Sequence, residues 1–201
     1  MKKLFLMAAM IMTVALAFAD SPLTSCEFYR RYSSVSMVNT AERAIIITQP
    51  MMDYLANKAN PIAARVAVIN ALGWETENSG NDVKYFNMLK KKYNVDTEDK
   101  LAEKVDAGTL ITYAYLKAMS NYSDVWKAKQ LAEKAIEKNT GKSLTINLIA
   151  SVIQAQYYLE DDWSRVYRVV ANVVNDSSLK KDIKQEAIDD IWNYIKEYAK
   201  Y

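Results

Sequence analysis

The stretch RVYRVVANVV, residues 165–174, decides the fold class of this chain. Its valines are typical of β-strands, because β-branched side chains favour sheets. Their spacing indicates a helix instead. They fall at i, i+3, i+4, i+7 and i+8 on one helical face, whereas a half-buried strand would alternate apolar and polar residues. The valines are Val166, Val169, Val170, Val173 and Val174. We therefore predict an α-helix that Asp162 opens.

The helix belongs to a repeat with a period of about 38 residues. Apolar positions of an earlier helix, Val125, Ala128, Leu131, Ala132, Ala135 and Ile136, superpose on Trp163, Val166, Val169, Val170, Val173 and Val174. The helices that precede these two also repeat, since Ile153 superposes forward on Ile191 and back on Tyr115. We predict two helical hairpins at about 107–139 and 145–175, followed by a last helix at about 179–201.

The repeat resembles tetratricopeptide-type repeats, most clearly in DVWKAKQLAEKAIEKN, residues 124–139. There Ala128 and Ala135 are spaced as two small residues of that motif are, although the motif has a shorter period of ~34 residues. Val166 and Val173 take the alanine positions in the second unit. The resemblance covers about residues 107–201 and implies a solenoid of stacked antiparallel hairpins. The expected fold is all-α and TPR-like, with a less regular helical N-terminal half.

The N-terminal half shows helices without this period. Asn39 followed by Glu42 resembles a capping box, so we predict a helix that Pro50 interrupts and that resumes through Leu55. Further predictions are a buried helix at 62–72 between Pro61 and Gly73, a loop at WETENSGND, a helix marked by Val83, Phe86, Leu89 and Tyr93, and a short helix marked by Leu101 and Val105.

The first residues indicate export. Lys2 and Lys3 precede an uncharged apolar run that ends in small residues at Ala19, which is the layout of a secretory signal peptide. We predict a signal peptide at 1–19, an irregular segment at 20–37 and one helical domain at 38–201, in a periplasmic, extracellular or envelope-associated location. The apolar run is too short to favour a permanent membrane span. Leu23-Thr24-Ser25-Cys26 also resembles a lipobox, which leaves lipidation of Cys26 as the alternative.

Composition excludes several classes of function. The chain has no histidine and one cysteine, which removes histidine-based catalysis, histidine zinc sites and thiolate metal sites. Lys2 and Lys3 account for the net charge of +2, so the rest of the chain is neutral and a nucleic-acid partner is not expected. We expect no cofactor, no metal and no catalytic residue.

One polar stripe is the candidate binding surface. It follows the first helix of each repeat unit and offers amides, hydroxyls and aromatic rings, which suit a protein or peptide partner, or alternatively a glycan. An ordinary solvent face is the competing interpretation. The predicted partner-binding residues are Tyr113, Asn147, Ser151, Gln154, Tyr158, Gln185 and Trp192.

Two functions remain open from the sequence. The first is an exported, non-enzymatic helical-repeat protein that binds a protein, a peptide or an envelope component. The alternative is a carboxylate-based hydrolase of glycans or cell-wall polymer, which needs two carboxylates from different elements facing one cleft. The acidic groups available are residues 160–162, which we interpret as a helix cap, and Glu186, Asp189 and Asp190, which we interpret as a solvated face.

Overall fold

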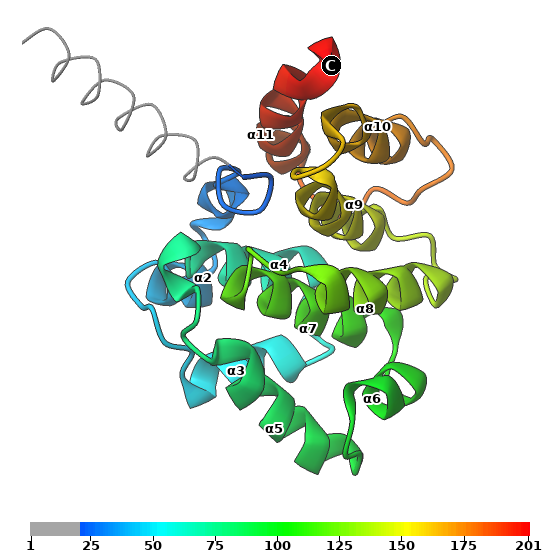
Figure 1. The fold of residues 1–201 in the computed structure, drawn as a ribbon. Coiled ribbons are helices and arrows are strands. Elements are labelled where there is room, and N and C mark those ends of the chain that lie inside the picture. Colours follow the sequence, from blue (N-terminus) through cyan, green and yellow to red (C-terminus); the bar gives the residue numbers. More distant parts are fainter. Residues whose placement is uncertain (1–20) are drawn as a thin grey trace, which may run out of the picture.

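The computed structural model describes residues 21–201, and over this range the protein is all-helical with no β-strand (Figure 1). The α-helices are α2 (Ser36–Ala41), α3 (Gln49–Ala56), α4 (Ile62–Ala71), α5 (Asn81–Tyr93), α6 (Glu98–Lys104), α7 (Ala107–Ser120), α8 (Trp126–Glu137), α9 (Leu144–Tyr158), α10 (Trp163–Val174) and α11 (Gln185–Ile195). The short 3-10 helices are η1 (Phe28–Tyr32), η2 (Trp74–Thr76) and η3 (Lys196–Lys200). The predicted signal peptide lies outside the described residues.

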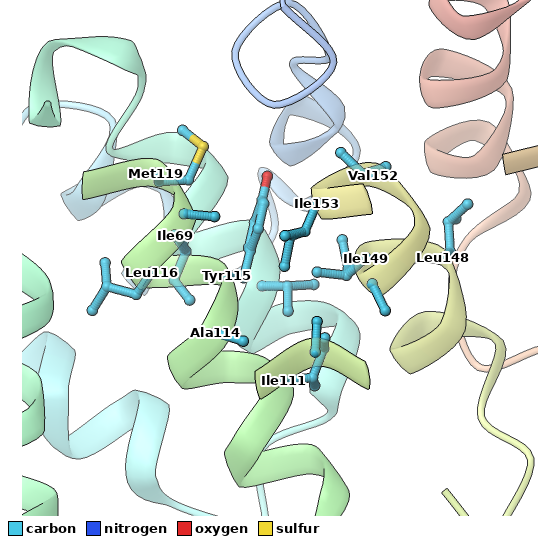
Figure 2. Close-up of a cluster of buried hydrophobic side chains, with 14 of the residues drawn as sticks. Ile69, Ile111, Ala114, Tyr115, Leu116, Met119, Leu148, Ile149, Val152 and Ile153 are labelled. Carbon is cyan, nitrogen blue, oxygen red and sulfur yellow. The ribbon is translucent and has the colours of Figure 1, made fainter. Parts of the chain in front are cut away.

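The core is built around α7, which is buried on nearly every side. The antiparallel partner α8 packs on one flank, while α9 and the N-terminal helices α4 and α5 pack on the others. Figure 2 shows apolar side chains of α7 and α9, including Ile111, Tyr115, Ile149 and Ile153, gathered between the two helices. The phenol of Tyr115 receives a hydrogen bond from Asn70 Nδ2 of α4 at 3.1 Å. The two halves of the chain therefore share one core.

The C-terminal helices pack against their neighbours in sequence. Helices α7 and α8 form one hairpin and α9 and α10 form the next, with α8 also packed on α9. Helix α11 packs on α10 and on η1, and it lies with the C-terminus at the end of the molecule opposite α5 and α6 (Figure 1). No helix within residues 21–201 combines the length and apolarity that crossing a bilayer requires.

The valine stripe forms a helix, as its spacing predicts. Val166 and Val170 are fully buried, and the other three valines are half-buried at the edge of the core. Asp162 is the N-cap of α10, where its carboxylate accepts a hydrogen bond from the backbone nitrogen of Arg165 at 3.1 Å. The predicted helical periodicity and the predicted first turn are both confirmed.

The helix expected from Asn39 to Leu55 is wrong. Asn39 lies inside the short α2, and a separate helix, α3, begins at Gln49 with Pro50 in its first turn. Proline fixes φ near the helical value and has no N–H, so the first turn of a helix accommodates it. Pro50 therefore starts a helix that the sequence analysis expected it to interrupt.

Two other expectations need correction. The last helix begins at Gln185 rather than near 179, because the preceding segment forms a parallel bridge from Lys180 to Ser143. Val83, expected on an apolar face, is 55% exposed in the first turn of α5, whereas Leu89 of the same predicted set is fully buried. The buried helix α4 between Pro61 and Gly73 and the short helix α6 agree with their predictions.

Candidate functional site

The polar stripe predicted along the first helices is accessible only in part. Tyr113 of α7 is 1% exposed, because α5 and the start of α6 cover that side of the helix. Its hydroxyl donates to Glu98, and its ring stacks on Phe86 with the centroids 5.5 Å apart. Ser151 of α9 is also buried and donates to the carbonyl of Leu148 at 2.8 Å. These two residues therefore form no part of an open surface.

The remaining stripe residues of α9 reach solvent. Asn147, Gln154 and Tyr158 are half-buried. Asn147 lies near the start of the helix, where its amide donates to the carbonyl of Ser143 at 2.9 Å. Gln154 and Tyr158 lie one turn apart at the other end, about 10 to 16 Å away along the helix axis. Only these last two residues are close enough to contact one small group of a partner.

The stripe does not continue directly from α9 to α11. Gln185 is exposed and donates to the carboxylate of Asp189 at 2.7 Å. Trp192 is half-buried, with its ring centroid 5.4 Å from that of Tyr167 on α10. Because α11 packs mainly on α10 and η1, its two stripe residues lie apart from those of α9.

An aromatic group surrounds the C-terminal end of α9. The rings of Tyr157 and Tyr158 meet edge to face at 5.3 Å. The guanidinium of Arg165, from the first turn of α10, lies 4.6 Å from the centroid of Tyr158. The ammonium of Lys129, from α8, lies 5.0 Å from the centroid of Tyr157. These cation–π contacts hold the two tyrosines in place while leaving Tyr157 37% exposed.

A second aromatic group lies on the other side of the α9–α10 turn. Trp163 begins α10 and meets Tyr201 edge to face at 4.6 Å and Tyr198 at 6.0 Å. Its indole nitrogen donates to the carbonyl of Leu159 at 2.7 Å, which fixes the ring at the turn. Trp163 is 45% exposed and Tyr201 is 56% exposed. The turn therefore presents aromatic rings to solvent on both of its flanks.

We call these residues together the α9–α10 surface. It consists of Gln154, Tyr157, Tyr158, Trp163, Arg165 and Tyr201. Tryptophan, tyrosine and arginine are the residues that most often carry binding energy in protein interfaces. Aromatic rings that neighbouring side chains already fix in place also lose little conformational freedom when a partner covers them. The arrangement can therefore bind an apolar or planar group of a partner, with polar contacts from Gln154 and Arg165.

Sequence reasoning found Gln154 and Tyr158 but missed Trp163 and Arg165. The repeat aligned Trp163 with Val125, which is 4% exposed, and so suggested a core position. The size of the Trp163 side chain was the signal that could have revealed its exposed position. An indole cannot occupy the space of a valine in an equivalent unit without displacement, so a tryptophan there indicates a different environment.

Several carboxylates from different helices are engaged in ion pairs. Asp82 of α5 and Glu98 of α6 come from different elements, but both bind the ammonium of Lys117, at 3.3 and 3.0 Å. Asp190 forms a bidentate ion pair with Arg31, with both hydrogen bonds at 2.7 Å. It therefore does not belong to the solvated face that the sequence analysis expected. Across residues 21–201, no three carboxylate or thiol groups are close enough to hold a metal ion.

Cys26, the residue of the lipobox resemblance, lies in the core and is 3% exposed. Asn70 Nδ2 donates to its carbonyl at 3.0 Å, and the same side chain accepts from the backbone nitrogen of Tyr29. Asn70 therefore ties this part of the chain to α4 through two backbone groups.

Comparison with known proteins assigns no relative to this architecture: no family model, no curated protein and no solved structure matches the chain. The candidate site is therefore defined by its own geometry.

Proposed function

We propose that this chain is an exported, non-enzymatic helical protein that binds a protein or peptide partner through the α9–α10 surface. The supporting observation is the exposure of Trp163 and Tyr201 at the α9–α10 turn, together with the Tyr158 and Arg165 pair on the other side of that turn. Large exposed aromatic rings that are already held by neighbouring side chains are suited to association. They bury much apolar area on contact, and their order is established before binding.

The proposed architecture is a short tetratricopeptide-type stack. Helices α7 to α10 would be two stacked hairpins and α11 the first helix of a third unit. The packing of α8 on α9 and of α11 on α10 is consistent with such a stack. In this arrangement the α9–α10 turn is one edge of the second hairpin, and a partner that contacts it also reaches the last helix. Export is proposed from the N-terminal sequence alone.

A protein or peptide partner is preferred over a glycan for one reason. The rings of the α9–α10 surface meet at steep angles, 76° for Tyr157 with Tyr158 and 88° for Trp163 with Tyr201. A sugar usually stacks on one open ring face, whereas angled rings form notches that fit apolar side chains. For the hydrolase alternative, Asp82 and Glu98 come from different helices but share the ammonium of Lys117, which gives no support to an acid and base pair there.

The test is partner capture from the native envelope fraction with the purified protein as bait, quantified by mass spectrometry. Replacing Tyr158 and Trp163 with alanine is expected to reduce recovery of the specific partner at least tenfold. The matched control is Trp126→Ala, because Trp126 is 54% exposed at the start of a different helix, α8. That variant removes as much exposed indole and should capture normally.

Thermal unfolding accompanies every variant, because Trp163 also contacts Tyr198 and Leu159. Loss of capture counts only for a variant whose helical circular dichroism is retained. Equal recovery with the double variant and with Trp126→Ala would contradict the proposal and place the binding surface elsewhere.

A further inference from the structure

Arg65 carries a charge inside the protein. It lies in the middle of α4, on a helix otherwise made of apolar residues and Asn70, and it is 3% exposed. One terminal nitrogen donates to the carbonyl of Leu55 at a long 3.4 Å, and Nε has no hydrogen-bond partner. Within residues 21–201 no carboxylate lies within ion-pair distance of it. Arginine retains its proton in proteins, so this positive charge is not removed by burial.

The surroundings of Arg65 contain further unsatisfied polar atoms. The hydroxyls of Tyr85 and Tyr93, both on α5, are buried without a hydrogen-bond partner, and both residues interact electrostatically with the guanidinium. Burial lowers the pKa of Arg65, because loss of water outweighs the favourable effects of Tyr85 and Asp106. Buried polar atoms usually have a hydrogen-bond partner, and Arg65 Nε and these two hydroxyls are three that have none within the described protein residues.

A cavity of about 380 Å³ is lined by Arg65, but not by Tyr85 or Tyr93. Its lining includes Lys58, Asn60, Arg65, Asp106 and Gly108. Gly108 is the second residue of α7, where backbone N–H groups have no intrahelical partner and the helix dipole favours an anion. Asp106, the N-cap residue, accepts from the backbone nitrogen of Thr109 at 2.8 Å. The cavity thus combines a buried guanidinium with the positive end of a 14-residue helix.

Gly108 is needed for this arrangement because of space. A Cβ atom at position 108 would lie 2.9 Å from Nη2 of Arg65 and 3.0 Å from Cδ1 of Ile62. Its backbone conformation is an ordinary helical one, so alanine would be accepted if the space were free. Glycine here permits the guanidinium to lie directly against the first turn of α7.

The carboxylates at the cavity are already engaged. Asp106 binds the ammonium of Lys58 at 2.5 Å. Asp182 accepts hydrogen bonds from the backbone and hydroxyl of Thr145 and from the hydroxyl of Ser143. Lys58 is therefore paired with Asp106, whereas no carboxylate of the described residues forms an ion pair with Arg65. The guanidinium of Arg65 is the cationic group at the cavity without a direct partner.

We propose that this cavity binds the carboxylate of a small organic acid, with Arg65 and the first turn of α7 as its two anchors. The planar guanidinium offers paired N–H groups that match a carboxylate, and the backbone N–H groups of α7 supply further donors. A monoanion fits better than phosphate, because the carboxylates of Asp106 and Asp182 also line the cavity and repel a doubly charged anion more strongly. The site is separate from the α9–α10 surface and does not depend on the proposed function.

The experiment is an NMR titration of the purified ¹⁵N-labelled protein with sodium acetate, at ionic strength held constant with sodium chloride. Saturable shifts are expected for the backbone amides of Ala107 and Gly108 and for the side-chain Nε–H of Arg65. A parallel titration with inorganic phosphate should require at least a tenfold higher concentration for the same shifts. Absence of saturable shifts with acetate, or tighter binding of phosphate, would overturn the proposal.

Variants assign the effect to Arg65. Arg65→Met keeps the length of the side chain and removes the buried charge, so it should fold and should abolish saturable shifts at Gly108. Arg65→Lys, which keeps a charge but loses the planar fork, should weaken acetate binding at least fivefold. The matched control Arg43→Met removes an exposed arginine and should bind acetate as the native protein does. Undiminished acetate binding by Arg65→Met would overturn the assignment.

Discussion

Asp182 accepts hydrogen bonds from both the backbone nitrogen and the hydroxyl of Thr145, at 2.9 and 2.8 Å. Thr145 is fully buried in the first turn of α9, where backbone N–H groups lack intrahelical partners. The hydroxyl of Ser143, the N-cap residue, also donates to Asp182 at 2.5 Å. The segment before α11 thus caps the start of α9, and this explains why the last helix begins later than the periodicity predicts.

The first prediction concerns this cap. Asp182→Ala should lower the free energy of unfolding by about 1 to 3 kcal/mol, because three donors at the start of α9 lose their acceptor. Asp182→Asn keeps one acceptor oxygen and should cost less. The exposed Asp161→Ala is the control and should stay within ~0.5 kcal/mol of the native protein. Urea unfolding measures all three, and equal stability of Asp182→Ala and Asp161→Ala would contradict the capping role.

The second prediction uses two valines of opposite exposure. Val170→Asp should destabilise by several kcal/mol or prevent folding, because Val170 is fully buried in the centre of the α10 stripe and the new carboxylate has no partner. Val83→Asp should be nearly neutral. Val83 is 55% exposed in the first turn of α5, where the helix dipole favours an acidic residue. Thermal unfolding of both variants separates the two positions, and similar melting temperatures would mean that the α10 stripe is not core.

The helical class was predictable because periodicity depends on local spacing. The stripe of Val166 and Val170 marks the buried face of α10, and the apolar stretch after Pro61 marks α4 as a buried helix. Both patterns are set by residues that are near one another in sequence. The same is true of Asp162, whose role as an N-cap follows from its position before the stripe.

The candidate sites were less predictable because they depend on contacts between distant residues. Tyr113 occupies a stripe position, yet α5 and Glu98 cover it, which no spacing within α7 could reveal. Arg65 is a single charge in an apolar helix, and only the folded structure shows that it is buried, with its Nε unpartnered among the described residues. Accessibility and pairing of side chains are tertiary properties, whereas the sequence pattern predicts the face of one helix at a time.

The third prediction is a loss of stability at alkaline pH that depends on Tyr113. Burial, followed by the hydrogen bond to Glu98, raises the pKa of Tyr113 above its ordinary value. Burial would lower the pKa of Lys117, but Glu98 and Asp82 outweigh it and the pKa is raised. In both cases the folded state keeps a proton that the unfolded state releases above about pH 10. The stability that each of these two protonated groups contributes is therefore fully present below about pH 10 and is lost as the pH rises.

Urea unfolding between pH 9 and 12 tests this dependence. The free energy of unfolding should fall as the pH rises. Tyr113→Phe should make this slope shallower by up to about 1.4 kcal/mol per pH unit, which is the effect of one proton. It should also lower stability at neutral pH, because Glu98 loses a donor. Tyr201→Phe is the control, since Tyr201 is 56% exposed and should leave the slope unchanged. An identical slope for Tyr113→Phe and the native protein would contradict the prediction.

The last prediction decides between signal-peptide cleavage after Ala19 and lipidation at Cys26. Residues 21–25 form a hydrogen-bonded turn in which the backbone nitrogen of Ser25 donates to the carbonyl of Ser21 at 2.9 Å. Leu23, within that turn, is fully buried in the core. Lipoprotein processing would cut before Cys26, so it would remove Leu23 and would require a buried sulfur to carry the lipid. Cleavage after Ala19 keeps both the turn and the core contact.

Intact-mass analysis of the protein recovered from the cell envelope is therefore expected to give a chain of residues 20–201 without added acyl groups. A matched pair of variants separates the two routes. Cys26→Ser should leave both the mass pattern and the export unchanged, apart from the substitution itself. Ala19→Leu should block cleavage, because signal peptidase requires a small residue before the cut. If the exported protein instead began at Cys26 with a diacylglyceryl group, the N-terminal turn and Leu23 would be absent from the mature fold, and the anchoring role of Asn70 would have to be measured again on that form.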